Sequence, residues 1–138
     1  MEELAVADVG VERFNRDHQR LLFYVQEFTS LCDRFRQRTP FPDEWDQVDL
    51  LFRRLEDYTR NHFRSEEGEL SKIGFPALSA HQQQHQYFVD VLTNLKTKVV
   101  NREFRAIGTV ETLLIDWIVN HINQTDVQYR TYLSTEST

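Results

Sequence analysis

The sequence predicts an all-α fold, an antiparallel up-down-up-down four-helix bundle with a short N-terminal arm. The chain has 138 residues but only four glycines and three prolines, which leaves few positions for tight turns. Breaks fall at 39–43, 74–76 and 101–108, and each of the four segments between them repeats apolar residues at steps of three and four, the period of one helix face. Short connections favour antiparallel neighbours, so we expect one domain over residues 1–138.

The four expected helices follow from their apolar stripes and their punctuation. We expect them over about residues 11–37, 43–69, 76–100 and 104–133. The stripe of the first begins at Phe14, and Asp43 is a suitable N-cap for the second. Pro76 suits the first turn of the third helix, and the stripe of the fourth includes Trp117.

Composition excludes several classes of function. Sixteen Lys and Arg against 22 Asp and Glu give a net charge of -6, which would repel a nucleic-acid backbone, so we expect no nucleic-acid partner. No stretch approaches the roughly 20 apolar residues of a membrane span, so we expect no membrane partner. The single Cys32 cannot form an intrachain disulfide, and the N-terminus lacks a secretory signal, so we expect a cytoplasmic protein.

The five histidines all lie on the apolar stripes of their helices. A lone histidine in that position is usually a hydrogen-bonded core residue. Burying five imidazoles together with the carboxylates of Glu66 and Asp126 would, however, leave many unpaired polar groups, each costing about 1–3 kcal/mol. A bound cation would satisfy them together.

Spacing supports a shared metal site. His62 and Glu66 are four residues apart, as are His81 and His85, so each pair projects from one helix face about 40° apart. Either pair alone is a weak signal, because such spacings arise by chance. On adjacent antiparallel helices, the two pairs converge on one layer of the bundle.

The remaining candidate pair, His121 and Asp126, is five residues apart. A regular helix would separate the two side chains by about 140° and turn one of them away from the core. A π-bulge, which adds one residue to a turn, would bring both onto the same face, and such bulges occur at functional sites. The spacing therefore predicts a π-bulge between His121 and Asp126. In a regular helix, one of the two could not be a ligand.

These motifs resemble the bacterial branch of the hemerythrin family over about residues 9–133. The resemblance rests on four segments: His18, His62-Phe-Arg-Ser-Glu66, His81-Gln-Gln-Gln-His85 and Trp117-Ile-Val-Asn-His121-Ile-Asn-Gln-Thr-Asp126. All seven positions of the family's spacing are matched. The chain departs from the family at Asp17, where Gln or Glu is commoner, and it lacks the usual N-terminal Trp.

The resemblance implies two iron ions joined by an oxo or hydroxo bridge. One iron would be bound by His81, His85 and His121, the other by His18 and His62, and both would be bridged by Glu66 and Asp126. Two octahedral ions offer twelve positions, of which five imidazoles, two bridging carboxylates and one bridging oxygen fill eleven. The open position falls on the iron bound by two histidines. Zinc or manganese could also occupy such a nitrogen and oxygen site.

The resemblance further implies that O2 binds at the open position. The residues expected around it are apolar: Phe63, Trp117, Ile118, Ile122 and Leu22. Because this pocket offers no acid to protonate bound oxygen, reversible binding is favoured over oxygenation. We therefore expect an oxygen storage, delivery or scavenging protein, and not an enzyme.

Three alternatives stay open at this point. The domain could sense O2 or redox state for a signalling output domain in a larger protein, although a chain from Met1 to just beyond the fourth helix suggests a free-standing one. It could reduce peroxide or nitric oxide at the same metals. It could also be a metal-free bundle.

Overall fold

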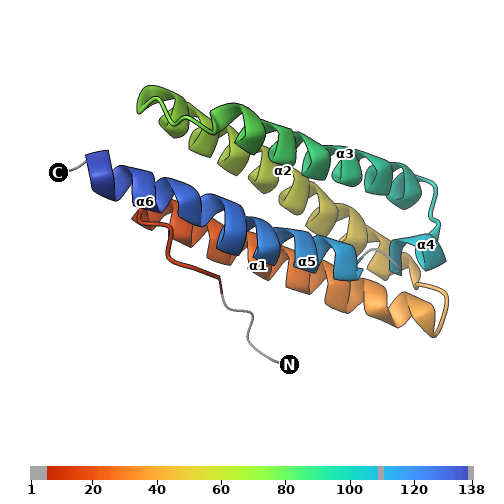
Figure 1. The fold of residues 1–138 in the computed structure, drawn as a ribbon. Coiled ribbons are helices and arrows are strands. Elements are labelled where there is room, and N and C mark those ends of the chain that lie inside the picture. Colours follow the sequence, from red (N-terminus) through yellow and green to blue (C-terminus); the bar gives the residue numbers. More distant parts are fainter. Residues whose placement is uncertain (1–5, 109–110, 137–138) are drawn as a thin grey trace.

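The computed structural model describes residues 6–108 and 111–136, in which all regular elements are helices and no strand occurs (Figure 1). The elements are α1 (Glu12–Asp33), η1 (Arg34–Arg36), α2 (Pro42–Lys72), α3 (Leu78–Val100), α4 (Phe104–Gly108), α5 (Glu111–Asn120), η2 (His121–Asp126) and α6 (Val127–Glu136). The short η1 is a 3₁₀-helix and η2 is a π-helix. The all-α prediction is confirmed.

Four rods make up the bundle. Three are α1, α2 and α3, and the fourth is formed by α5, η2 and α6 in line (Figure 1). Successive rods run in opposite directions. α1 packs against α2 and α5, and α2 packs against α3. Among the described residues, no helix is long and apolar enough to cross a membrane.

The ends of α2 differ from the expected ones for local reasons. The helix starts at Pro42, not at about residue 43, because proline suits the first helical position. Its N-cap is therefore Phe41 and not Asp43, and the Glu44 carboxylate accepts the Phe41 N–H at 2.9 Å. The helix continues to Lys72, beyond the expected 69, until Gly74 adopts φ +65°.

The other helix ends shift for similar reasons. α3 begins at Leu78, whereas a start at about 76 was expected, because residues 76–77 form the turn that follows Gly74. α1 ends at Asp33 and is continued to Arg36 by η1, close to the expected end at 37. The expected helix over 104–133 is divided into α4, α5, η2 and α6, and residues 109–110 lie outside the described part of the chain.

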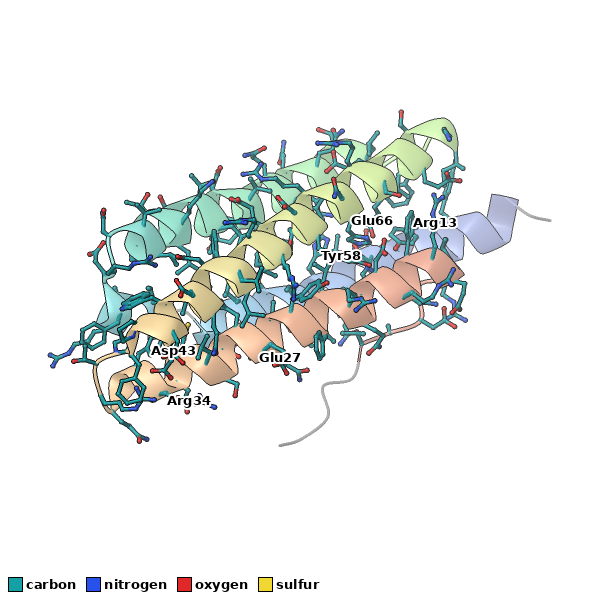
Figure 2. All side chains as sticks on the ribbon, turned by 180° about the vertical axis from the view of Figure 1, so that it is seen from behind. Arg13, Glu27, Arg34, Asp43, Tyr58 and Glu66 are labelled. Atoms are coloured by element: carbon teal, nitrogen blue, oxygen red, sulfur yellow. The ribbon has the colours of Figure 1, made fainter. Side chains whose placement is uncertain are left out.

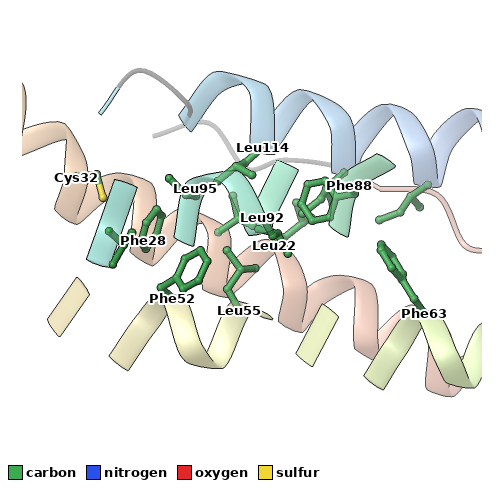
Figure 3. Close-up of a cluster of buried hydrophobic side chains, with 14 of the residues drawn as sticks. Leu22, Phe28, Cys32, Phe52, Leu55, Phe63, Phe88, Leu92, Leu95 and Leu114 are labelled. Atoms are coloured by element: carbon green, nitrogen blue, oxygen red, sulfur yellow. The ribbon is translucent and has the colours of Figure 1, made fainter. Parts of the chain in front are cut away.

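One half of the bundle interior contains a cluster of apolar side chains (Figure 3). We call it the apolar layer, and it comprises Phe28, Phe52, Leu55, Leu92, Leu95 and Leu114. Each of these side chains is at most 4 % exposed, so they fill the space between the rods without polar groups. The other half holds the histidines and carboxylates of the candidate site, and we call it the polar half.

The N-terminal arm packs against the polar half. Val9 is fully buried in the core, and the Ala7 N–H donates to the Asn123 side-chain oxygen at 2.7 Å. The Arg130 guanidinium donates to the Asp8 carbonyl at 2.8 Å. The arm therefore ties the start of the chain to η2 and α6.

Candidate metal centre

All four rods contribute to the polar half of the interior. The seven expected ligands are His18 from α1, His62 and Glu66 from α2, His81 and His85 from α3, and His121 and Asp126 from η2. Each is at most 5 % exposed. Figure 2 shows Glu66 between the helices, whereas Glu27 is exposed on the outside of α1. The helix-face spacing thus brings all seven side chains together.

The π-helix η2 spans His121–Asp126, as the five-residue spacing predicts. The wide turn places both side chains inside, with His121 5 % exposed and Asp126 1 % exposed. Without the extra residue, one of them would point about 140° away from the other. The predicted π-bulge is confirmed.

Glu66 lies at the middle of the cluster. Its Oε1 is 2.6 Å from the Nε2 of His81 and 3.1 Å from that of His85. Its Oε2 is 3.2 Å from the Nε2 of His62 and 3.5 Å from that of His18. One carboxylate therefore contacts imidazoles from three rods.

Asp126 closes the other side of the cluster. Its Oδ1 is 3.0 Å from the Nε2 of both His81 and His121, and its Oδ2 is 3.1 Å from the Nε2 of His18. Despite these distances, neither Asp126 oxygen nor either ring nitrogen of His18 has a hydrogen-bond partner among the described residues. The atoms converge on common points and do not aim at one another.

Acceptors outside the cluster fix the histidine tautomers. The Nδ1 of His85 is 2.7 Å from the Glu67 carboxylate, and the Nδ1 of His62 is 2.8 Å from that of Asp17. The Nδ1 of His121 is 2.8 Å from the Gln84 side-chain oxygen. Because these oxygens accept hydrogen bonds, each Nδ1 carries a proton, and each Nε2 is the ring nitrogen that faces the interior and can bind a metal.

The residues present therefore fit bound cations. The Nε2 atoms of His85 and His121 are 3.1 Å apart, so a bound metal ion or a shared proton must lie between them. Two groups of ligand atoms, each within 4.8 Å of one another, share Glu66: one adds His81, His85, His121 and Asp126, the other adds His18 and His62. Imidazole and carboxylate ligands suit first-row divalent metals.

The electrostatics keep both central carboxylates ionised. Burial alone would raise the pKa of Glu66, but hydrogen bonds from the surrounding imidazoles hold it well below its usual value. Burial and the Glu66 charge would raise the pKa of Asp126, and its histidine neighbours lower it instead. Burial would lower the pKa of His62, but Asp17 and Glu66 raise it to about 9 when no metal is bound.

Tyr129 supports Glu66 from α6. Its hydroxyl donates to the Glu66 Oε2 at 3.1 Å. Burial and then the charges of Glu66 and Asp126 raise the pKa of this phenol, so it stays protonated and remains a donor. The Glu66 carboxylate is thereby held in one orientation.

A small cavity borders the cluster and is lined by four of its residues, His18, His62, His121 and Asp126. It is also lined by the expected Phe63, Trp117, Ile118 and Ile122, and in addition by Leu21, Thr59 and Phe88. About 10 Å³ is open to the centre of a water-sized molecule, and about one such sphere is what a single water needs. The cavity thus has room for one small molecule.

Leu22 does not line this cavity, contrary to the sequence-based expectation. Leu21 lines it instead, and Leu22 belongs to the apolar core cluster (Figure 3). Relative to His18, Leu21 is turned about 60° one way around the helix and Leu22 about 40° the other way. The cavity lies on the side of α1 from which Leu21 projects.

A family model described as the hemerythrin HHE cation binding domain matches residues 9–132, which include all seven cluster residues. The chain belongs to the hemerythrin family. The family's di-iron centre fits the two groups of ligand atoms that share Glu66.

Individual hemerythrins place the chain in the bacterial branch. It is 36 % identical over 88 residues to a bacteriohemerythrin of Methylococcus capsulatus, a match that covers 64 % of each chain, just under two thirds of that relative. It is 23 % identical over 124 residues to a bacteriohemerythrin of Clostridium acetobutylicum, covering 88 % of this chain and 92 % of the relative. A crystal structure of wild-type hemerythrin has the same fold, with a TM-score of 0.78 at 24 % identity over 95 % of both chains.

Sequence reasoning about this hemerythrin missed the roles of the outer acceptors. Asp17 entered only as a departure from the family pattern, yet it accepts from His62 and, at 2.7 Å, from the Tyr58 hydroxyl. Asp17, Glu67 and Gln84 each adjoin a ligand in sequence and bond an imidazole on another rod. An acceptor next to a ligand is the signal that could have identified them.

Aromatic rings fix the imidazole planes from the cavity side. Phe63 stacks on His85 with ring centroids 3.8 Å apart and an interplanar angle of 1°. Trp117 stacks on His121 at 4.4 Å and 11°. Two of the expected pocket residues therefore also orient ligands of this hemerythrin.

Proposed function

We propose that this protein binds O2 reversibly at its di-iron centre and serves in oxygen storage, delivery or scavenging. The proposal is carried by the unequal division of ligands. Five residues surround one metal position and three surround the other, and a cavity borders both groups, lined by His18 and His62 of the smaller and by His121 and Asp126 of the larger. An incomplete ligand set beside a cavity is typical of a site that takes up a small molecule.

The ligand assignment follows the same distances. His81, His85 and His121 would hold one iron, His18 and His62 the other, and Glu66 would hold both. Asp126 would also bridge, because its two oxygens lie 3.0 Å from His81 and 3.1 Å from His18. Ferrous iron, when bound there, supplies the electrons with which O2 is held.

The surrounding residues favour binding over catalysis. Phe63, Phe88, Ile118 and Ile122 give the cavity apolar walls and exclude bulk water. Apart from the proposed ligands, no described lining residue is a carboxylic acid, a histidine or a cysteine that could deliver a proton. O2 that enters is therefore expected to leave unchanged.

Reconstitution tests the proposal. Protein loaded with ferrous iron without air should contain two irons per chain and gain a visible absorption band on exposure to O2, which disappears on deoxygenation. Protein loaded with zinc, which has no redox chemistry, is the control and should stay colourless. Failure to bind iron, or a colour change that deoxygenation does not reverse, would contradict the proposal.

The rate of autoxidation separates a carrier from the sensory alternative. Slow oxidation of the oxygenated protein supports storage, delivery or scavenging, and oxidation within seconds supports sensing. The cytoplasmic location stays a prediction that cell fractionation would test.

A further inference from the structure

Thr59 carries a buried hydroxyl with no partner. It lies on α2 three residues before His62 and is fully buried, and its Oγ1 makes no hydrogen bond to any described residue. A helical threonine commonly bonds a carbonyl of its own helix. In this chain Thr29 bonds the Gln26 carbonyl at 3.2 Å and Thr93 bonds the Val89 carbonyl at 2.9 Å. Thr59 differs from both.

Thr59 lies beside a cavity, which explains why its hydroxyl has no hydrogen-bond partner among the described residues. Thr59 lines the small cavity together with His18 and His62. Besides the proposed ligands and the Trp117 indole, it is the one described lining residue with a polar side-chain atom. Glu66 lies on the other side of His62 along α2, so Thr59 and the bridging carboxylate lie at opposite ends of this part of the site.

A buried donor that has no protein partner requires one from elsewhere. The cavity has about 10 Å³ open to the centre of a water-sized molecule, which is sufficient for one small molecule and no more. A molecule in this cavity would offer the Thr59 hydroxyl an acceptor that no described residue supplies. Apart from the proposed ligands and the Trp117 indole, the other described lining residues are apolar and offer it no competing hydrogen bond.

We propose that the Thr59 hydroxyl donates a hydrogen bond to the small ligand in the cavity and is a specificity-determining residue that favours ligands able to accept one. The inference rests on the proposed function, because the ligand enters beside the metal position of His18 and His62. It goes further because it assigns the choice between small ligands to Thr59, which is not a metal ligand.

Azide, a small anion that accepts hydrogen bonds, is the probe. In oxidised, iron-loaded protein, Thr59→Val keeps the side-chain shape and removes the donor, so azide should bind about two- to tenfold more weakly. Thr59→Ser should restore the affinity. The infrared stretching band of bound azide should shift in heavy water for wild type and Thr59→Ser but not for Thr59→Val.

Iron-free protein gives a second measurement. If the hydroxyl has no protein partner, Thr59→Val should unfold in urea at a midpoint no lower than wild type. The matched control is Thr29→Val, which removes a hydroxyl bonded within α1 and should lower the midpoint. A lower midpoint for Thr59→Val than for wild type would show an internal partner and overturn the inference.

The remaining outcomes separate this inference from the proposed function. Equal azide affinity in iron-loaded wild type and Thr59→Val, with equal heavy-water shifts, overturns the inference and leaves the proposed function standing. Wild-type protein that takes up no iron overturns both.

Discussion

Glu44 and Glu66 are both buried carboxylates of α2, but they are satisfied in different ways. Glu44 receives two hydrogen bonds from the Arg38 guanidinium, at 2.6 and 2.9 Å, and one from the Phe41 N–H. Glu66 is surrounded by imidazoles, and the Nε2 atoms of His62 and His85 lie 3.2 and 3.1 Å from its oxygens. Groups of the chain alone therefore satisfy the Glu44 carboxylate. The Glu66 carboxylate needs positive charge from a bound metal or from protons on its imidazoles.

The comparison extends to the two halves of the bundle interior. The apolar layer is held by hydrophobic burial and close packing, which depend on no ligand. The polar half contains unpaired buried atoms on His18 and Asp126. Stability should therefore be independent of iron in one half and coupled to iron in the other.

Removing Glu66 should have the largest effect. Glu66→Ala deletes the carboxylate shared by both metal groups, so iron affinity should fall by more than about a hundredfold. Iron content per chain, measured after desalting, checks this. Glu44→Ala is the control and should retain two irons, even though it destabilises the α1–α2 end. A full iron complement in Glu66→Ala would contradict the ligand assignment.

A cavity in the apolar layer should cost stability without affecting the metal. Phe28→Ala removes a side chain that is 1 % exposed, and such truncations cost about 3–5 kcal/mol. Urea denaturation should give the same loss for iron-free and iron-loaded protein. Phe23→Ala, at a position 51 % exposed, is the matched control and should change little. A loss that depended on iron would mean that the two halves are coupled.

Weakening an outer acceptor should have a smaller effect on one metal. Asp17→Asn removes the charge that faces the Nδ1 of His62, and comparable changes lower metal affinity about 10- to 100-fold. Competition with a chelator should release one iron earlier than in wild type. Asp90→Asn, whose partner is the nearby Gln86, is the control. Simultaneous release of both irons would contradict the assignment of His62 to one metal.

Acidification should affect the two regions at different pH values. Imidazoles must be deprotonated to bind metal, so iron should be released as pH falls below about 6. The Arg38 hydrogen bonds hold the pKa of Glu44 at about 2. Its contribution to stability is therefore fully present above its unfolded pKa, near 4.5, and is lost as pH falls toward 2.

Absorption and circular dichroism separate the two steps. The visible band should disappear first, and the difference in helix content between wild type and Glu44→Gln should shrink only at lower pH. Loss of both signals at one pH would show that Glu44 does not titrate independently of the metal centre.

The convergence of the seven proposed ligands was predictable, because each lies on a helix face whose direction is set by periodicity. The π-bulge was predictable because a five-residue spacing cannot otherwise place His121 and Asp126 inside. Leu21 and Leu22 could not be told apart, because both flank His18 and the choice depends on which rods pack beside α1. Thr59 drew no attention because a threonine within an apolar stripe looks like an ordinary core residue.

The outer acceptors escaped prediction for a different reason. Asp17 and His62 are 45 residues apart, and Gln84 and His121 are 37 apart. Such pairs form only when the rods are assembled, so no local pattern contains them. That an acceptor adjoins a proposed ligand in sequence identifies its role only when the rod packed beside it is known.

The wide turn at η2 joins two helical repeats that are out of phase by one residue. Before the wide turn, Ile118 and His121 are three residues apart on the buried face. After it, Asp126 and Tyr129 are again three apart on the buried face, and all four are buried. Deleting the exposed Gln124 would restore an ordinary helical turn and leave both stripes facing inward. Straightening η2 at its present length would instead rotate Asp126 and Tyr129 outward together. The number of residues in η2 and its helix type are therefore linked. Six residues require the π-helical turn, and an α-helical turn requires one residue fewer.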